Sequence, residues 1–186
     1  ISARIRIPRL HRVPGMRLAA VSAALLTWSC SAMAQLPASP PACTAAEHRQ
    51  FDFWIGRWEV FTPDGKKAGE NHIEAIDGGC ALIERWRGNG GFSGTSLNSW
   101  DAQARQWRQH WVDNQGGLLQ LAGGLDGGSM VLSSSGPDPD QPGATLRQRI
   151  LWTALSDGAV RQHWQTSRDD GATWGTAFDG RYVRLK

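Results

Sequence analysis

The sequence predicts an all-β domain, an up-and-down antiparallel β-barrel of about ten strands preceded by a short helix. From residue 53 onward, apolar and polar residues alternate, and turns rich in Gly, Asp and Asn recur about every 8 to 12 residues. No later segment has a helical period long enough for a crossover helix, so successive strands are expected to pair as hairpins. Closing such a meander into a barrel removes its exposed edges.

Each element has its own local signal. A helix is expected over residues 45–52, because Thr44 and Glu47 have the spacing of a capping box. The strands are separated by turns of the kind formed by Asp126-Gly127-Gly128, and one long loop is expected at 136–144. The expected strands cover residues 53–62, 69–76, 80–87, 93–100, 106–113, 118–122, 129–134, 145–154, 159–167 and 177–185.

Residues 1–34 have the pattern of a leader with a signal peptide. A short basic start at Met16-Arg17 precedes an apolar stretch, and Ala32-Met33-Ala34 forms a cleavage site. We expect cleavage after Ala34, a Pro- and Ala-rich linker over 35–43, and a single domain over 44–186 that is periplasmic or secreted. Residues 1–15 are either translated upstream sequence or an extended start of the leader.

The charged residues of the mature chain argue against nucleic acid as a partner and against a membrane-spanning barrel. The leader carries five arginines and no acid, which leaves 20 − 5 = 15 basic against 17 acidic residues. With both signs interspersed, the domain has no electrostatic footprint for nucleic acid. Charged residues such as Arg57, Arg85 and Arg108 lie on the faces that would meet lipid, so we expect a barrel that does not span a membrane.

Two cysteines, Cys43 and Cys80, remain after the expected cleavage. In an oxidising compartment, an even pair in a small exported domain favours a disulfide. The alternative is two buried thiols that do not meet, because the sequence does not supply the Cα separation that decides between them.

Gly56-x-Trp58 on the first strand, with Arg184 or Arg181 on the last, resembles the calycins, which include lipocalins, fatty-acid-binding proteins and haem-binding nitrobindins. In those barrels the arginine lies over the tryptophan ring, so the resemblance implies that Trp58 and Arg184 close this barrel, with Arg181 as the alternative partner. A wider set of motifs looks like an exported bacterial domain family of unknown function that is treated as lipocalin-like. These motifs are F-D-F-W-I-G-x-W (51–58), W-x-Q-x-W-V-D (107–113), V-R-Q-x-W (160–164) and F-D-G-x-Y-V-R (178–184).

The chain has ten tryptophans, nine of them after the leader, and a single tyrosine. Alternation places most of these tryptophans on the same strand faces as a few polar side chains. If that face is inward, the lumen has aromatic walls and convergent polar groups, the usual composition of a small-molecule site. We expect a small apolar or aromatic ligand to contact Glu84, Trp86, Asn98, Gln109, Trp111, Arg149, Gln162 and Trp164. The alternative is a filled core in which these polar groups bond one another.

No cofactor, metal site or catalytic residue is assigned. Nitrobindins bind haem through a histidine, but alternation turns His110 and His163 away from the tryptophan face. Metal-binding spacings such as H-E-x-x-H and C-x-x-C are absent from the sequence. Two other functions remain open besides binding. One is an isomerase- or lyase-like enzyme with Glu84 as general base beside Arg149 as anion holder, and the other is an interaction domain without a ligand.

Overall fold

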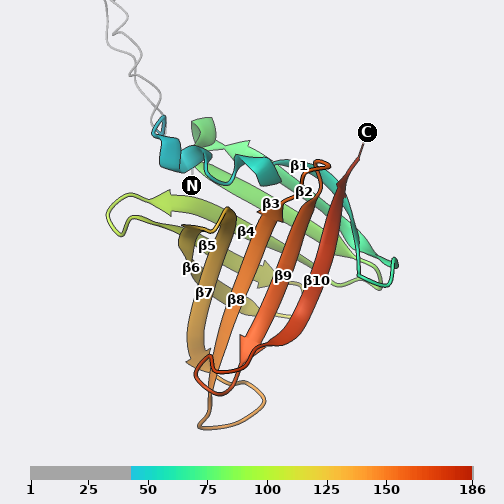
Figure 1. Ribbon diagram of the computed structural model, residues 1–186, viewed down its shortest axis with the longest axis vertical. Coiled ribbons are helices and arrows are strands. Elements are labelled where there is room, and N and C mark those ends of the chain that lie inside the picture. Colours follow the sequence, from blue (N-terminus) through green and yellow to red (C-terminus); the bar gives the residue numbers. More distant parts are fainter. Residues whose placement is uncertain (1–42, 186) are drawn as a thin grey trace, which may run out of the picture. The chain divides into compact units, whose positions relative to one another are not determined.

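A computed structural model describes residues 43–185 of the chain. The expected leader, its cleavage site and all of the linker except Cys43 lie outside the described residues. The described part is a closed antiparallel barrel in which each strand pairs with its sequence neighbours and β1 pairs with β10 (Figure 1). The strands are β1 (Gly56–Phe61), β2 (Lys67–Ile76), β3 (Ala81–Gly88), β4 (Ser93–Asp101), β5 (Gln106–Asp113), β6 (Leu118–Asp126), β7 (Ser129–Pro137), β8 (Thr145–Ala154), β9 (Val160–Ser167) and β10 (Gly175–Arg184).

The short helix expected before the first strand is present as two 3-10 turns, η1 (Ala46–Arg49) and η2 (Asp52–Trp54). The expected capping box is wrong. Ala45, not Thr44, is the residue before η1, and no side chain caps the turn. A capping box needs the hydroxyl at that position, so Thr44 lies one residue too early. Because η2 continues to Trp54, β1 starts at Gly56 and is shorter than expected.

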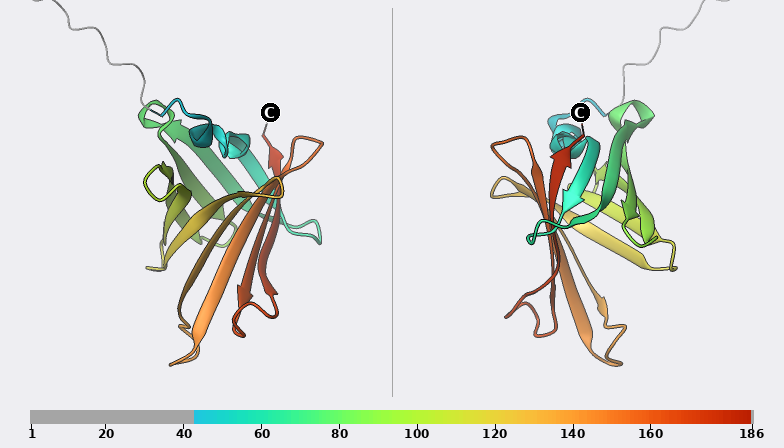
Figure 2. Two further views of the ribbon diagram at one scale, coloured as in Figure 1. Left: turned by 60° about the vertical axis from the view of Figure 1, so that its left-hand side comes forward. Right: turned by 90° about the vertical axis from the view of Figure 1, so that its right-hand side faces the viewer.

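The two turns close one end of the barrel with aromatic rings. Phe51 stacks on Trp54 with ring centroids 4.8 Å apart, and it forms T-shaped pairs with Trp107 and Trp152 at centroid distances of 5.6 Å and 5.2 Å. These four side chains are buried from solvent. Figure 2 shows the turns at one end of the barrel and the β7–β8 and β9–β10 hairpins projecting at the other.

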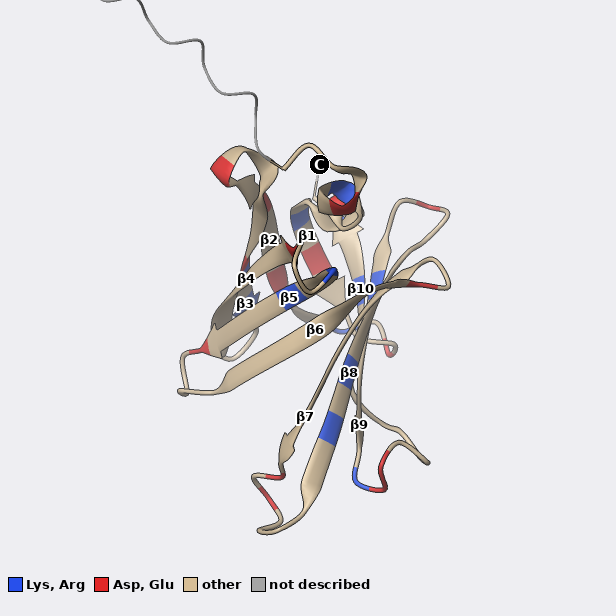
Figure 3. Cartoon of the chain, turned by 90° about the vertical axis from the view of Figure 1, so that its left-hand side faces the viewer, with Lys and Arg blue, Asp and Glu red and all other residues tan. Residues whose placement is uncertain are grey.

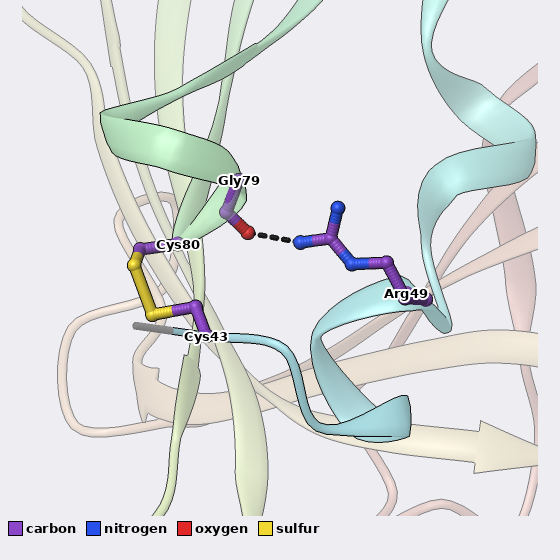
Figure 4. The surroundings of a disulfide bond; sticks show 4 residues. All are labelled: Cys43, Arg49, Gly79 and Cys80. Atoms are coloured by element: carbon purple, nitrogen blue, oxygen red, sulfur yellow. Dashed lines mark hydrogen bonds between the residues drawn. A yellow bond between two sulfur atoms is a disulfide. The ribbon is translucent and has the colours of Figure 1, made fainter. Parts of the chain in front are cut away.

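A disulfide links Cys43 to Cys80, as the sequence predicted, with the two Cα atoms 5.0 Å apart. It ties the start of the described chain to the residue before β3 (Figure 4). Arg49 of η1 donates a hydrogen bond to the carbonyl of Gly79, which belongs to the third 3-10 turn, η3 (Asp77–Gly79). The disulfide and this hydrogen bond add to the aromatic contacts that attach the closing turns to the barrel.

Charged residues of both signs are spread along the strands and loops (Figure 3). Several form ion pairs between neighbouring strands or across a turn, such as Lys67 with Glu59 at 2.8 Å and Arg161 with Asp179 at 2.7 Å. Exposed pairs of this kind contribute little to stability. Within residues 43–185, no helix has the length and apolar character needed to cross a membrane.

The hairpin over residues 167–174 folds as a side-chain-stabilised turn. The Asp169 carboxylate accepts hydrogen bonds from the backbone N–H of Thr173 at 2.9 Å and from its hydroxyl. These bonds, with a further one from Ser167, lower the pKa of Asp169 to about 2. The Trp174 indole donates to the carbonyl of Gly171, so its ring lies against the turn.

Candidate functional site

A cavity of about 360 Å³ lies inside the barrel. Its lining includes Asn89, Phe92 and Ala177, which are exposed, so the cavity reaches the surface between the strand ends that carry them. These strand ends lie at the opposite end of the strands from the aromatic closure, since β5 begins beside Trp107 at the closure and ends at Asp113 on the cavity. The lining residues are Ala68, Glu84, Trp86, Gly88, Asn89, Phe92, Gln109, Trp111, Asp113, Leu119, Ile150, Gln162, Trp164, Ala177, Phe178 and Tyr182.

Aromatic rings form the walls of the cavity. The rings of Trp86 and Phe178 form a T-shaped pair with centroids 6.3 Å apart, and the ring centroids of Trp111 and Phe92 are 6.5 Å apart. A glycine makes room for one of these rings, because a Cβ atom on Gly94 would lie 2.1 Å from the Trp111 ring. The Trp111 ring therefore occupies the space that a side chain at position 94 would take.

A buried chain of polar side chains runs from Asn71 on β2 to Gln109 on β5. Its centre is the Glu84 carboxylate, which accepts hydrogen bonds from Asn71 Nδ2 at 2.7 Å and from Ser96 Oγ at 2.6 Å. Asn98 Nδ2 donates to Ser96 Oγ at 2.8 Å, and Gln109 Nε2 donates to Asn98 Oδ1 at 2.8 Å. All five residues are buried. These hydrogen bonds fix the two members of the series that reach the cavity, Glu84 and Gln109.

Tyr182 extends this network to the far wall. Its hydroxyl accepts a hydrogen bond from Asn71 Nδ2 at 3.3 Å and donates one to Gln162 Oε1. Burial raises the pKa of Tyr182 well above its usual value, and the nearby Glu84 charge raises it further. The phenol is therefore a neutral hydrogen-bonding group at physiological pH.

Glu84 is the buried carboxyl group on the cavity lining, with 4% of its surface exposed. Burial raises the pKa of Glu84, while the hydrogen bonds from Ser96 and Asn71 partly oppose this change. Among the described residues, no Lys, Arg or His forms a hydrogen bond or salt bridge with Glu84; its partners are Asn71 and Ser96. The site therefore holds a carboxyl group that keeps its proton at a higher pH than an exposed glutamate does.

The cavity brings together six of the eight residues that the sequence proposed as its lining. They are Glu84, Trp86, Gln109, Trp111, Gln162 and Trp164. Asn98 is fully buried beside the cavity and reaches it only through its bond to Gln109.

Arg149 does not belong to this group. Its neighbour Ile150 lines the cavity, so alternation along β8 turns Arg149 to the outer face. There its guanidinium carbon lies 4.0 Å from the centroid of the Trp174 ring, and its Nε donates to Gln165 at 2.9 Å. The expected placement of Arg149 beside Glu84 is therefore wrong, and the cavity has no anion holder from β8.

Sequence reasoning did not single out Asn71, Ser96, Phe178 and Tyr182. Ser96 shares a strand face with Asn98, which is two residues away, so the period of two could have identified it. Tyr182 is the one tyrosine of the chain and lies in the last motif named above, F-D-G-x-Y-V-R. Asn71 had no comparable signal, because its role depends on contact with β3 and β10.

The strand histidines do not fit a haem ligand at this site. His110 forms a hydrogen bond with the Gln120 side chain, and His163 forms one with the Thr176 hydroxyl. His72 Nε2 lies 3.7 Å from the Glu74 carboxylate. None of the three is among the residues that line the cavity. Across residues 43–185, no group of three His, Cys, Asp or Glu side chains has a metal-binding arrangement.

Trp58 and the last strand meet at the closed end as the calycin resemblance implied. Trp58 pairs with Arg184 in the β1–β10 register, and the Arg184 guanidinium carbon lies 4.2 Å from the centroid of the Trp58 ring. Arg181, the alternative partner, forms an ion pair with Asp157 instead.

A family described as "Protein of unknown function (DUF1579)" matches residues 44–184. The match covers nearly all of the described barrel, so the chain belongs to the DUF1579 family. No curated protein matches the sequence.

Proposed function

We propose that this DUF1579 protein is an exported binding or carrier protein that holds a small, mainly apolar or aromatic molecule in its barrel. The observation that carries the proposal is the cavity of about 360 Å³ with aromatic walls and a fixed polar floor. Pockets of this size, mostly apolar with a few placed polar groups, are typical of small-molecule sites. A core filled with side chains leaves no space of this size.

The place of the protein in the cell is part of the same proposal. The leader pattern of residues 1–34 and the disulfide between Cys43 and Cys80 support a periplasmic or secreted location. The closure of the barrel by Trp58 and Arg184 supports a lipocalin-like relationship.

A lumen enzyme is the second candidate, and one observation favours it. Glu84 is a buried carboxyl group with a raised pKa on the cavity floor, which is typical of a general acid or base. Its hydrogen bonds to Asn71 and Ser96 hold it in one orientation. Turnover of a bound compound by the native protein, lost in Glu84→Gln, would favour the enzyme over the carrier.

Native mass spectrometry of protein purified from its own extracytoplasmic compartment tests the binding proposal. A co-purifying molecule of a defined mass, released on unfolding, is the expected result. A screen of small apolar and aromatic compounds by thermal shift then provides binders, because a ligand at 100 times its Kd adds about 2.7 kcal/mol to stability.

The cavity variant Trp111→Leu should weaken binding with little loss of stability, since it keeps an apolar side chain at the wall. Trp174→Leu is the matched control, because Trp174 packs on an outer hairpin and does not line the cavity. Equal loss of binding in both variants would contradict the proposed site.

A further inference from the structure

The charges on the cavity lining have one sign. Two lining residues are acids, Glu84 and Asp113, and no Lys, Arg or His is found among the lining residues. Asp113 lies toward the mouth, where its carboxylate accepts the backbone N–H groups of Gln115 and Gly117, each at 2.9 Å. Glu84 lies on the floor and has no such backbone partners. An anionic ligand would therefore meet only like charge inside the cavity.

The Glu84 carboxyl group has unused acceptor capacity. Each of its two oxygens accepts one hydrogen bond, from Asn71 and from Ser96, whereas an ionised carboxylate offers about four acceptor positions. A buried carboxylate without a cation is unfavourable, because burial removes its hydration and nothing replaces the lost charge interaction. A positive group brought in by a ligand would supply that interaction.

The walls of the cavity suit a positive group as well. Trp86, Trp111 and Trp164 line it together with Phe178 and Phe92. The faces of aromatic rings, and of indoles most strongly, attract cations, and this attraction grows when the cation is desolvated. The structure already shows this contact twice elsewhere, with Arg184 on Trp58 and Arg149 on Trp174. Those two rings are occupied by the chain's own arginines, whereas no arginine or lysine of residues 43–185 lines the cavity.

We propose that the ligand of this cavity is an organic cation, an apolar or aromatic molecule that carries an ammonium group and pairs that group with Glu84. This inference rests on the proposed binding function and adds the charge of the ligand to it. The aromatic walls enclose the apolar body, and the floor carboxylate selects the positive head. Neutral compounds of the same shape and anionic compounds bind more weakly.

The test uses three small probes of similar length in the full mature protein at pH 7.5: 2-phenylethylamine, 2-phenylethanol and 3-phenylpropanoate. Titration calorimetry or tryptophan fluorescence measures each Kd. The amine is protonated at this pH, because a simple alkyl amine titrates near the lysine value of about 10.4. We expect the amine to bind at least tenfold more tightly than either other probe, a difference that corresponds to about 1.4 kcal/mol.

Glu84→Gln removes the charge while keeping the size of the side chain and its acceptor oxygen. This variant should lose at least tenfold in affinity for the amine and change the affinity for the alcohol less than twofold. Glu74→Gln is the matched control, since it makes the same substitution at a carboxylate that pairs with Arg85 and does not line the cavity. The control should change the affinity for the amine less than threefold.

The native protein supplies a second readout that needs no variant. Measured from pH 4 to pH 9, affinity for the amine should rise with pH as Glu84 loses its proton, while affinity for the alcohol should not change. The titratable group that faces Glu84 is Tyr182, which stays neutral over this range. A flat pH profile for the amine would overturn the inference even if Glu84→Gln did not fold.

The outcomes separate this inference from the function on which it rests. If the alcohol or the carboxylate binds as tightly as the amine, or Glu84→Gln keeps the affinity for the amine, the cationic ligand is wrong and a binding cavity still stands. If none of the three probes binds while the neutral fluorophore N-phenyl-1-naphthylamine does, the same conclusion follows. If that fluorophore also fails to bind, the binding function itself is wrong.

Discussion

The guanidinium of Arg184 lies over the indole ring of Trp58, with its Cζ atom 4.2 Å from the ring centroid. The two residues face each other where β1 meets β10, the pairing that closes the barrel. Arg184 Nη1 also donates to the carbonyl of Ile55 at 3.1 Å, and the Trp58 indole donates to the carbonyl of Trp54 at 2.9 Å. The last strand is thereby joined to the residues that precede the first strand.

Trp58→Ala should be severely destabilising. Trp58 is fully buried, and truncating a buried tryptophan costs about 3–5 kcal/mol. Arg184→Leu should cost much less, about 0.5–1 kcal/mol, because Arg184 is exposed and keeps an apolar side chain. Urea unfolding followed by circular dichroism measures both values. An unchanged urea midpoint for Trp58→Ala would show that this contact does not hold the barrel closed.

Gly56→Ala should destabilise the same closure for a different reason. Gly56 has a φ of 146°, and a Cβ atom there would lie 2.2 Å from Arg184 Nη1. The glycine of the Gly-x-Trp unit therefore leaves room for the arginine over the ring. We expect a loss above about 1 kcal/mol by urea unfolding.

Gly175→Ala is the control for this substitution, because the nearest atom to a Cβ there is 4.0 Å away. It should change stability by less than about 0.5 kcal/mol. Equal effects of the two alanine substitutions would mean that the clash with Arg184 does not explain the glycine.

Loss of the disulfide should lower stability by about 4 kcal/mol in the chain-entropy model, given its sequence separation of 37 residues. The double variant Cys43→Ala/Cys80→Ala, compared with the oxidised native protein by urea unfolding, measures this value. Intact mass after alkylation without reductant checks the bond itself. Uptake of two labels by the folded, oxidised protein would contradict the disulfide.

Glu84→Gln should make the protein more stable at high pH. Burial raises the pKa of Glu84 in the folded state above 4.5, its ordinary value. The folded state therefore binds this proton more tightly than the unfolded state, so stability is full below pH 4.5 and falls as pH rises through the folded pKa. The variant has no proton to lose there.

Unfolding free energies of the native protein and Glu84→Gln, measured from pH 4 to pH 9, test this point. The gap between them should widen in favour of the variant as pH rises and then level off. A gap that widens in the opposite direction would show that the folded state stabilises the ionised carboxylate.

The barrel could be predicted from the sequence because alternation with a period of two and glycine-rich turns are local signals. The same period placed Trp86, Trp111 and Trp164 on the cavity face. It should also have excluded Arg149, because Trp152 is inward on β8 and Arg149 is three residues away. Arg149 was assigned to the cavity for its charge, although its position on the strand faces outward.

The polar floor of the cavity could not be predicted to the same extent. Asn71 and Glu84 meet across the β2–β3 hairpin, but Tyr182 lies 111 residues after Asn71, and their contact depends on the barrel closing between β1 and β10. The failed capping box at Thr44 has a more local cause, because the chain enters η1 one residue later than the motif requires.

Binding of N-phenyl-1-naphthylamine to the native protein and to Ala177→Trp tests whether the barrel cavity is a ligand site. Ala177 lines the cavity but is exposed, so a tryptophan there should narrow the mouth without disturbing the core. We expect saturable binding of one fluorophore per native chain, with energy transfer from tryptophan, and at least tenfold weaker binding by an equally stable Ala177→Trp. Absence of saturable binding to the native protein, or equal binding by both proteins, would contradict a ligand site in the barrel cavity.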